Sequence, residues 1–433
     1  MRGNSSIDLL NFKCVSIVEP LHYFGWAGLS DAIEGGYKMK VLFINSVCGI
    51  GSTGRICTDI AEVLEEKGHF AKIAYGRNSY VPEKCREYGI RVGTDIGVKV
   101  HGLISRCFDA HGAGSKNATK KLINMIQEMD PDIIHLHNVH GYYLNIDVLF
   151  GFLRKWEKPI VWTLHDCWSL TGHCSYFDYV GCNKWEEGCG KCPQKESYPA
   201  SLFLDRSAAN YLHKKALFSG LGNLTIVTPS QWLADIVKKS YLNTYSVHVI
   251  NNGIDTNEFR ERTTNLREKY DIPENKKILL GVSMGWPPSK RLDYMVRLSE
   301  DLDSEYKVVI IGIDEKQKKN IPSNIIAISK TKNVSELAEW YATADVFVNP
   351  TMQDNYPTVN LEAQACGTPV VTFDSGGSKE CISENYGVAV ERGNYNQLKE
   401  AVIRAASLKR RNVYIKNQRE FTEEYLALYK ALL

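Results

Sequence analysis

Short runs of consecutive apolar residues alternate along this chain with longer segments in which apolar residues recur every three or four positions. The short runs predict buried parallel strands, and the longer segments predict the helices that cover them. The runs at 39–47 and 70–75 frame a helical pattern from about Arg55 to Lys67, so a β–α–β unit opens at Met39. Further strands are predicted at 132–137, 159–165 and 224–228 and then at 277–282, 307–311, 325–328, 346–348 and 369–373.

These two successive sets of strands and helices indicate two doubly wound α/β domains. We place the boundary between Tyr241 and Val247, which gives an N-terminal domain at 39–245, a C-terminal domain at 246–415 and a last helix at 416–433. Residues 1–38 show no clean periodicity. We expect either that Met39 is the natural start or that residues 1–38 form a poorly ordered extension, and no apolar core typical of a signal peptide follows Arg2.

Length and charge narrow the classes of function. The 433 residues suffice for two domains with separate cores, and a formal net charge of +2 does not suggest a nucleic-acid partner. No apolar run is long enough to span a membrane. Two basic clusters, at 116–121 and 409–411, are either solvated faces or contacts to an anionic surface.

The segment Asp354-Asn-Tyr-Pro-Thr-Val-Asn-Leu-Glu362-Ala-Gln-Ala-Cys-Gly367-Thr-Pro369-Val follows a predicted strand and predicts a loop that leads into a short helix. Thr358 is the expected N-cap and Gly367 the expected C-terminal stop. Two carboxylates then flank a helix N-terminus whose free N–H groups favour an anion. Hydroxyl groups bind carboxylates and diphosphates bind N–H groups, so the motif suits a nucleotide-sugar. The alternative is a capped surface helix with two solvated acids.

This segment resembles the nucleotide-binding motif of retaining glycosyltransferases of family 4, whose GT-B fold consists of two Rossmann-like domains facing a central cleft. The family motif is usually Glu-x7-Glu followed by Ala-x-Ala-x-Gly-x-Pro. Its spacing is kept here, but Asp354 stands in place of the first Glu. The resemblance runs from Met39 to near the C-terminus, includes Asn252-Gly253-Ile254-Asp255, and implies a last helix that crosses back onto the first domain.

The resemblance implies transfer of a sugar from a nucleoside-diphosphate-sugar to a hydroxyl of a glycan or lipid-linked saccharide in bacterial polysaccharide biosynthesis. Such an enzyme would be cytoplasmic or peripheral at the inner face of the plasma membrane. By the same resemblance Glu362 holds the ribose hydroxyls, Asp354 holds a donor-sugar hydroxyl, and Lys290 neutralises the leaving diphosphate. No acid–base pair is needed if the leaving phosphate takes the acceptor proton, and no cofactor or divalent metal is implied for the chemistry.

One departure from the family concerns a basic pair that clamps the diphosphate. The family usually has an Arg and then a Lys in this pair. Lys290 matches the Lys, but no Arg stands at the preceding position of the pair, and Arg291 replaces the glycine that usually follows the Lys. Whether Arg291 supplies the missing charge is left open. The remaining donor-binding candidates are the loop and helix start of the motif and a second glycine loop after residue 373: Asn355, Tyr356, Pro357, Thr358, Gly376 and Gly377.

The loop Gly49-Ile-Gly51-Ser-Thr-Gly54 follows the first predicted strand and matches the dinucleotide fingerprint. The rival hypothesis is therefore an NAD(P)-dependent oxidoreductase that uses Gly49, Gly51 and Gly54. The second strand, however, ends at Tyr75-Gly-Arg77 without the acid that holds a ribose. In the family that the chain resembles, this loop instead faces the donor phosphates and the acceptor, which makes Gly51 and Gly54 donor-binding candidates. A glycine turn that serves only the packing of helix against strand is the remaining alternative.

Three histidines lie at the ends of predicted strands, where α/β folds place ligands. The resemblance matches His165 to a histidine near the reacting sugar, where it would hydrogen-bond donor or acceptor hydroxyls. His137 and His140 are candidates for the acceptor side. For each of them, a buried histidine with satisfied hydrogen bonds is the alternative.

Five of the twelve cysteines lie between Cys167 and Cys192, in an insert at 167–199. The series Cys174, Cys182, Cys189 and Cys192 ends in a Cys-x2-Cys pair, which suits a structural tetrahedral Zn²⁺ site. Disulfides and cysteines without a joint function are the alternatives. Cys-rich inserts of this kind also occur in a bacterial subset of the family that the chain resembles.

Overall fold

The computed structural model describes residues 37–77 and 80–433. Residues Lys38–Leu433 form one compact unit, in which Met39 is buried. The expected N-terminal extension, residues 1–38, lies outside the described residues except for Tyr37 and Lys38. Among the helices of the described part of the chain, none combines the length and apolar character needed to span a bilayer.

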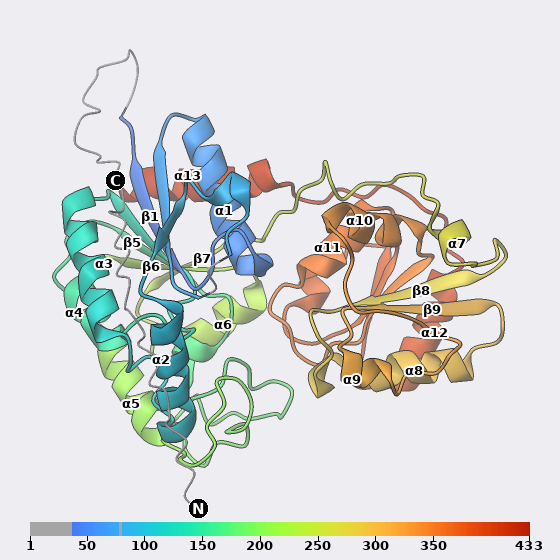
Figure 1. Ribbon diagram of the computed structural model, residues 1–433, viewed down its shortest axis with the longest axis horizontal. Coiled ribbons are helices and arrows are strands. Elements are labelled where there is room, and N and C mark those ends of the chain that lie inside the picture. Colours follow the sequence, from blue (N-terminus) through green and yellow to red (C-terminus); the bar gives the residue numbers. More distant parts are fainter. Residues whose placement is uncertain (1–36, 78–79) are drawn as a thin grey trace, which may run out of the picture. The chain divides into compact units, whose positions relative to one another are not determined.

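The first sheet has seven parallel strands in the order β3-β2-β1-β4-β5-β6-β7. Its strands are β1 (Lys40–Asn45), β2 (Phe70–Tyr75), β3 (Gly89–Arg91), β4 (Ile133–Leu136), β5 (Ile160–Thr163), β6 (Leu224–Thr228) and β7 (Ser246–Val249). The helices of this domain are α1 (Gly51–Glu66), α2 (Asp95–Phe108), α3 (Lys116–Met129), α4 (Ile146–Leu153), α5 (Ser207–Phe218) and α6 (Gln231–Lys239), drawn in blue to green in Figure 1.

The second sheet has six parallel strands in the order β10-β9-β8-β11-β12-β13. Its strands are β8 (Lys277–Val282), β9 (Tyr306–Ile311), β10 (Ile326–Ile328), β11 (Val346–Asn349), β12 (Val370–Phe373) and β13 (Gly387–Val390). The helices are α7 (Leu266–Lys269), α8 (Leu292–Asp301), α9 (Glu315–Lys318), α10 (Val334–Thr343), α11 (Thr358–Ala365) and α12 (Tyr395–Ala405) (Figure 1). The prediction of two doubly wound α/β domains is confirmed.

The last helix, α13 (Gln418–Leu432), returns to the first domain. Its side chains Phe421, Tyr425 and Tyr429 pack in the same apolar core as the residues of β1 and α1. The Tyr429 hydroxyl also hydrogen-bonds the ring of buried His135 on β4, at 2.6 Å. Gly253 makes this return possible, because a Cβ there would lie 2.3 Å from the carbonyl oxygen of Asn417.

The domain boundary lies further along the chain than the sequence indicated. We expected the second domain to begin between Tyr241 and Val247, but β7 pairs with β6 in the first sheet, with Val247 beside Ile226. An edge strand carries little information about its sheet, because few of its side chains are covered: Ser246 and His248 are exposed, and Val247 and Val249 are half-buried. The chain therefore leaves the first sheet after Val249.

In each sheet the strand order reverses between two central neighbours, β1 and β4 in the first and β8 and β11 in the second. Ligands of doubly wound folds bind outside the carboxyl ends of the strands at such a switch point, because the two following loops diverge there. The loops that follow β1, β4, β8 and β11 are therefore the places to look for a site.

Candidate active site

Helix α11 follows β11 through the loop that holds Asp354. It begins at Thr358, with Pro357 as the N-cap, and no side chain of the described residues caps its first turn. The prediction that Thr358 is the N-cap is wrong by one residue. Its hydroxyl hydrogen-bonds the Glu362 side chain instead, one turn further on. The first N–H groups of α11 thus receive no side-chain acceptor, which suits an anion.

Glu362 is the most enclosed carboxylate of the site, with 3% of its surface exposed. Its Oε2 accepts a hydrogen bond from the Tyr341 hydroxyl at 3.2 Å, and its Oε1 lies 3.7 Å from the Arg55 guanidinium. Burial raises the pKa of Glu362, and the charge of Arg55 opposes that rise. A carboxylate with so few fixed donors keeps free acceptor positions for ligand hydroxyls.

Lys290 and Asp354 meet at the switch point of the second sheet. Lys290 ends a short 3₁₀ helix after β8, Pro288–Lys290, and its Nζ lies 2.6 Å from Asp354 Oδ2. The other oxygen, Oδ1, accepts a hydrogen bond from the backbone N–H of Asn355. Two residues that are far apart in the sequence and were both assigned to the donor site thus form one ion pair beside the start of α11.

Arg291 is not part of this pair. Its φ of 53° turns the chain away, and its guanidinium binds Asp293 at 2.6 Å. The same group stacks on the ring of Tyr294, 3.5 Å from the centroid. Among the described residues, Lys290 is therefore the cation that the loop after β8 presents to Asp354.

The second glycine loop holds the Asp354 loop in place. A Cβ at Gly376, whose φ is 57°, would lie 1.8 Å from the Asp354 carbonyl oxygen, and a Cβ at Gly377 would lie 2.0 Å from that of Asn355. The N–H of Gly377 donates to the Asp354 carbonyl at 3.1 Å. The glycines thus allow two backbones to touch, which fixes the position of the Asp354 carboxylate.

In the first domain, α1 begins at Gly51, and its N-terminus has no side-chain cap within the described residues. Gly51 has a φ of 63° and faces open space, whereas a Cβ at Gly54 would touch Val47 at 3.0 Å. Gly51 therefore leaves room for a ligand, and Gly54 serves the packing of helix against strand. Arg55, which the sequence analysis did not single out, extends from this turn to Glu362.

The predicted histidines lie just beyond the carboxyl ends of β4 and β5. His137 Nδ1 and His165 Nε2 lie 2.8 Å apart, and their rings stack with an interplanar angle of 17°. Burial lowers the pKa of His165 to about 4 and that of His137 well below its usual value, so both rings are neutral near pH 7. His140 Nε2 lies 2.9 Å from Asp166 Oδ2, and its Nδ1 lies 3.2 Å from the Tyr198 hydroxyl.

Asn355 joins the two groups of candidates. Its Nδ2 donates to the carbonyl of His165 at 3.0 Å, and its Oδ1 accepts from the Ser230 hydroxyl at 2.6 Å. The structure thus brings the donor motif of the second domain against the His165 segment of the first. Arg55, Tyr341 and Ser230 are the partners that sequence reasoning missed; Arg55 had a signal, as the cation that follows the glycine loop.

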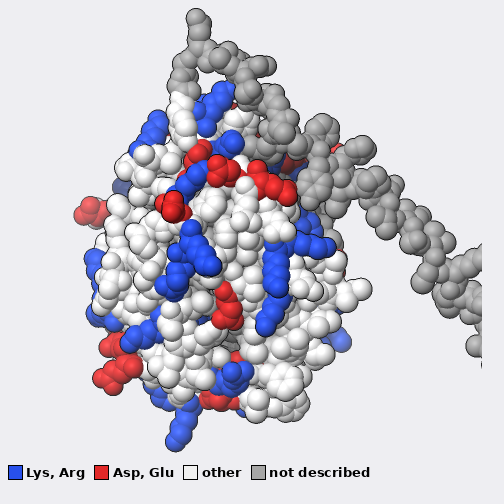
Figure 2. Space-filling view, turned by 90° about the vertical axis from the view of Figure 1, so that its left-hand side faces the viewer, with Lys and Arg blue, Asp and Glu red and all other residues white. Residues whose placement is uncertain are grey.

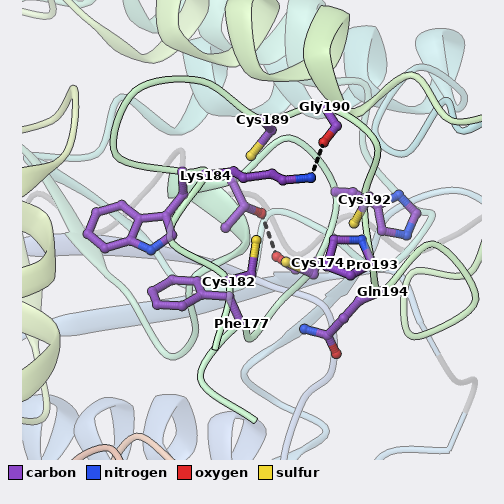
Figure 3. Close-up of a pocket in the computed structure, with 12 residues that line it drawn as sticks. Cys174, Phe177, Cys182, Lys184, Cys189, Gly190, Cys192, Pro193 and Gln194 are labelled. Carbon is purple, nitrogen blue, oxygen red and sulfur yellow. Dashed lines mark hydrogen bonds between the residues drawn. The ribbon is translucent and has the colours of Figure 1, made fainter. Parts of the chain in front are cut away.

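The four cysteines expected to bind zinc line a cavity of their own in the first domain (Figure 3). The cysteines of the described residues are free thiols. Within residues 37–77 and 80–433, no three His, Cys, Asp or Glu side chains are already in positions to hold a metal ion.

Two family models match the chain: "Glycosyltransferase Family 4" matches residues 53–258, and "Glycosyl transferases group 1" matches residues 262–421. The chain is 28% identical to WcaC of Escherichia coli (strain K12), described as a colanic acid biosynthesis glycosyl transferase, over 91% of this chain and 100% of WcaC. It is 25% identical to D-inositol 3-phosphate glycosyltransferase 2 of Catenulispora acidiphila, over 72% of this chain and 77% of that relative.

Solved structures share the fold at low sequence identity. Sucrose-phosphate synthase of Thermosynechococcus elongatus matches with a TM-score of 0.63 and 15% identity, covering 91% of this chain and 97% of that chain. Anabaena HepE in complex with UDP-glucose matches with a TM-score of 0.57 and 14% identity, covering 91% and 98%. These likenesses show the GT-B fold.

Both family models describe glycosyltransferases, so the rival hypothesis of an NAD(P)-dependent oxidoreductase is not supported. The matched ranges contain the histidine cluster, Lys290 and the α11 motif, and the first of them begins at residue 53, inside the glycine loop. The chain belongs to glycosyltransferase family 4, has the GT-B fold and is an enzyme that uses a nucleotide-sugar donor.

Proposed function

We propose that this enzyme transfers a sugar, with retention of anomeric configuration, to a hydroxyl of a glycan or lipid-linked saccharide in bacterial polysaccharide biosynthesis. The observation that carries the donor side is the Lys290–Asp354 ion pair beside the uncapped start of α11, one turn before buried Glu362. The similarity to WcaC, whose description names colanic acid biosynthesis, supports the choice of pathway class.

In this proposal the second domain binds the nucleotide and most of the donor sugar. Glu362 accepts hydrogen bonds from the two ribose hydroxyls, for which its free lone pairs are suited. The diphosphate lies against the N-terminal N–H groups of α11, and Lys290 turns from Asp354 to the phosphate. Asp354 is then released to accept a hydrogen bond from a sugar hydroxyl.

Charge builds on the diphosphate as its bond to the sugar breaks, and fixed positive groups stabilise that charge most in the transition state. Lys290 and the start of α11 supply such groups. The departing phosphate oxygen takes the proton of the acceptor hydroxyl, so the chemistry needs no separate general base. In the first domain, neutral His165 offers a hydrogen bond to a hydroxyl, and its stacked partner His137 orients it.

A screen of melting temperatures tests the donor assignment, because a ligand that binds only the folded state raises the melting temperature. The enzyme is mixed with UDP, GDP, ADP and dTDP sugars and, as the counter-test, with NAD(H) and NADP(H). One class of nucleotide sugar should stabilise the protein. Transfer from that donor to a saccharide acceptor, followed by NMR, should then give a product with the donor's anomeric configuration, and an inverted product would contradict the mechanism.

We further propose that the enzyme meets a lipid-linked acceptor at the membrane surface through α2. This helix leaves Ile96, Val100, Leu103 and Phe108 largely exposed. The loop that holds Leu202 and Phe203, also exposed, is tied to α2 by the hydrogen bond from the Leu202 N–H to the Arg106 carbonyl. Such an apolar face, interrupted by Lys99 and Arg106, is typical of segments that lie in a membrane interface.

The basic clusters noted in the sequence are weaker candidates for this contact. Arg410 is engaged inside the protein, where it donates to the carbonyls of Ala344 and Cys366. Figure 2 shows the face that carries α3, where Lys and Arg side chains are interspersed with acidic and neutral ones. Sedimentation with vesicles that contain anionic lipid tests the proposal: Leu103→Ser with Phe203→Ser should reduce binding, while substitution of Lys116 should not.

A further inference from the structure

The cysteine-rich insert is a long irregular segment. From Thr171 to Arg206, between a 3₁₀ turn at Trp168–Leu170 and α5, the described chain forms neither helix nor strand. Irregular connections longer than about 15 residues are uncommon in compact domains unless something holds them. Phe177 and Trp185 anchor one part of the insert in the core of the first domain, whereas residues 186–188 and Lys191, beside Cys189 and Cys192, are exposed.

The four cysteines of the insert surround one cavity of about 20 Å³, enough for a single water-sized occupant. Figure 3 shows the sulfur atoms of Cys174, Cys182, Cys189 and Cys192 pointing toward the same space. The Lys184 side chain lies across that space, and its ammonium donates to the carbonyls of Gly190 and Lys191 at 2.9 Å. The N–H of Gly172 donates to the Cys189 sulfur at 3.2 Å, as backbone groups do around metal-bound thiolates.

A buried cation lies beside this cluster. The Lys214 side chain is 3% exposed, and its ammonium donates to the carbonyls of Trp168 and Thr171. Among the described residues no carboxylate forms an ion pair with it. A buried charge without a counter-ion is costly. Thr171 also lines the cysteine cavity, so an anionic cluster in that cavity would lie near this ammonium.

A buried histidine gives an independent indication. His173 lines the cavity with 2% of its surface exposed, and its Nδ1 lies 2.6 Å from Asp109 Oδ1. Its Nε2 is buried without a hydrogen-bond partner in the described structure. Buried polar atoms are nearly always satisfied, so an orphaned one points to an absent group. A cluster of thiolates would give this ring an acceptor.

We propose that Cys174, Cys182, Cys189 and Cys192 bind one Zn²⁺ as thiolates and that this metal orders the insert. Four Zn–S bonds form as four S–H protons pass to solvent. Four thiolates and one Zn²⁺ have a net charge of −2, which the ammonium groups of Lys184 and Lys214 offset. To hold the ion with four sulfurs, the cysteine side chains would rotate from their present positions and Lys184 would withdraw from the cavity.

The metal would act on the donor site through a turn of the insert. Between Cys174 and Cys182, Asp178 Oδ1 lies 2.7 Å from the Arg392 guanidinium of the second domain. The N–H of Tyr179 donates to the side chain of Gln353, the residue before Asp354, at 3.1 Å. A zinc-ordered insert therefore holds this turn against the loop that carries the donor-binding Asp354.

Metal content tests the proposal directly, and it does not depend on the donor chemistry. The full-length protein, purified under reducing conditions, should contain about one zinc per chain by elemental analysis. Replacement by Co²⁺ should give the intense thiolate-to-cobalt absorption of a tetrahedral sulfur site. Metal-free protein with four freely titratable thiols, or protein whose thiols appear only after reduction of disulfides, would overturn the proposal.

Matched cysteine variants locate the ligands. Cys182→Ser and Cys192→Ser should each lower zinc content at least fivefold, whereas Cys107→Ser, a partly exposed free cysteine of α2 outside the cavity, should not change it. If these variants fail to fold, the wild-type protein can be treated with a thiol-modifying reagent instead. Release of zinc as the thiols react would show that cysteines hold the metal. Zinc retained after all four thiols are modified would overturn the assignment.

The role of the turn is tested separately. Asp178→Ala should keep the zinc but reproduce the change in donor KM that zinc removal causes in the wild type. Hydrogen exchange in residues 174–192 should rise on zinc removal and remain low in Asp178→Ala. A donor KM that is unaffected by both changes would overturn the link to the donor site while the metal content still reports on the zinc itself.

Discussion

Replacing Glu362 by Gln removes a charge from the centre of the donor site and keeps the shape of the side chain. In the described structure the carboxylate accepts hydrogen bonds from the hydroxyls of Tyr341, at 3.2 Å, and Thr358, and the Arg55 guanidinium lies 3.7 Å away. These partners leave acceptor positions of the Glu362 carboxylate free, so each of the two ribose hydroxyls of the donor can donate a hydrogen bond to it. Glu362→Gln should therefore weaken nucleotide binding while the fold is retained.

The magnitude follows from the type of hydrogen bond. A bond to a charged group contributes about 1.5–3 kcal/mol and a neutral one about 0.5–1.5 kcal/mol, so the loss is roughly 1–1.5 kcal/mol per bond. For two ribose hydroxyls this is about 2–3 kcal/mol, or roughly a 30-fold to 150-fold rise in Kd. Burial raises the pKa of Glu362, so its ionised form is unfavourable in the empty protein. The Gln variant should then unfold at the same temperature or higher.

Isothermal titration with the cognate nucleoside diphosphate measures Kd, and differential scanning calorimetry measures the stability of the empty protein. Glu336→Gln is the matched control, because Glu336 lies in the same domain, at the start of α10, and is paired with Lys269 at 2.8 Å and not with a residue of the donor site. Its Kd should equal that of the wild type. If Glu362→Gln binds the nucleotide as tightly as the wild type does, the role given to Glu362 is wrong.

Three further predictions concern the same site. Lys290→Ala should lower kcat more than it weakens binding of the free nucleoside, since its charge matters most as the diphosphate departs; unchanged kcat with the cognate donor would exclude that role. Gly376→Ala should weaken donor binding as well as stability, because its Cβ would collide with the Asp354 backbone. Gly285→Ala, also at positive φ but in open space, should cost only about 1 kcal/mol of stability. Equal donor affinities of the two variants would contradict the argument. The pKa of Glu362 is raised, so acidification should protonate it, and thereby weaken donor binding, at a higher pH than it would protonate an ordinary glutamate. Glu362→Gln should abolish this pH dependence of donor affinity. If the variant loses affinity over the same pH range, another group is responsible.

The buried strands were predictable because each is a compact apolar run between polar loops. Predicted ranges agree with β2, β6 and β8 at both ends. The short edge strands β3 and β13 were missed, since β3 has only three half-buried residues and the short apolar run of β13 is buried only at Val390. For the same reason β7 was assigned to the wrong domain. A strand at the rim of a sheet is defined by its neighbour, and the local sequence does not contain that neighbour.

The site residues were predictable in type but not in their pairings. Lys290 and Asp354 were both recognised by their places after strands, yet only the fold shows that they pair with each other. Arg291 is adjacent to Lys290 in sequence but binds Asp293 of its own helix. Tyr341 and Arg55 reach Glu362 from other elements, and no local pattern marks such a contact.

The central claim is that the donor nucleotide binds the second domain at the start of α11. Hydrogen exchange of the full-length enzyme, measured with and without the nucleoside diphosphate that raises its melting temperature, tests this claim most directly. The account predicts slower exchange in residues 354–365 and in the loop around Lys290. Protection confined to the first-domain glycine loop and the end of β2, at 49–54 and 75–77, would contradict it.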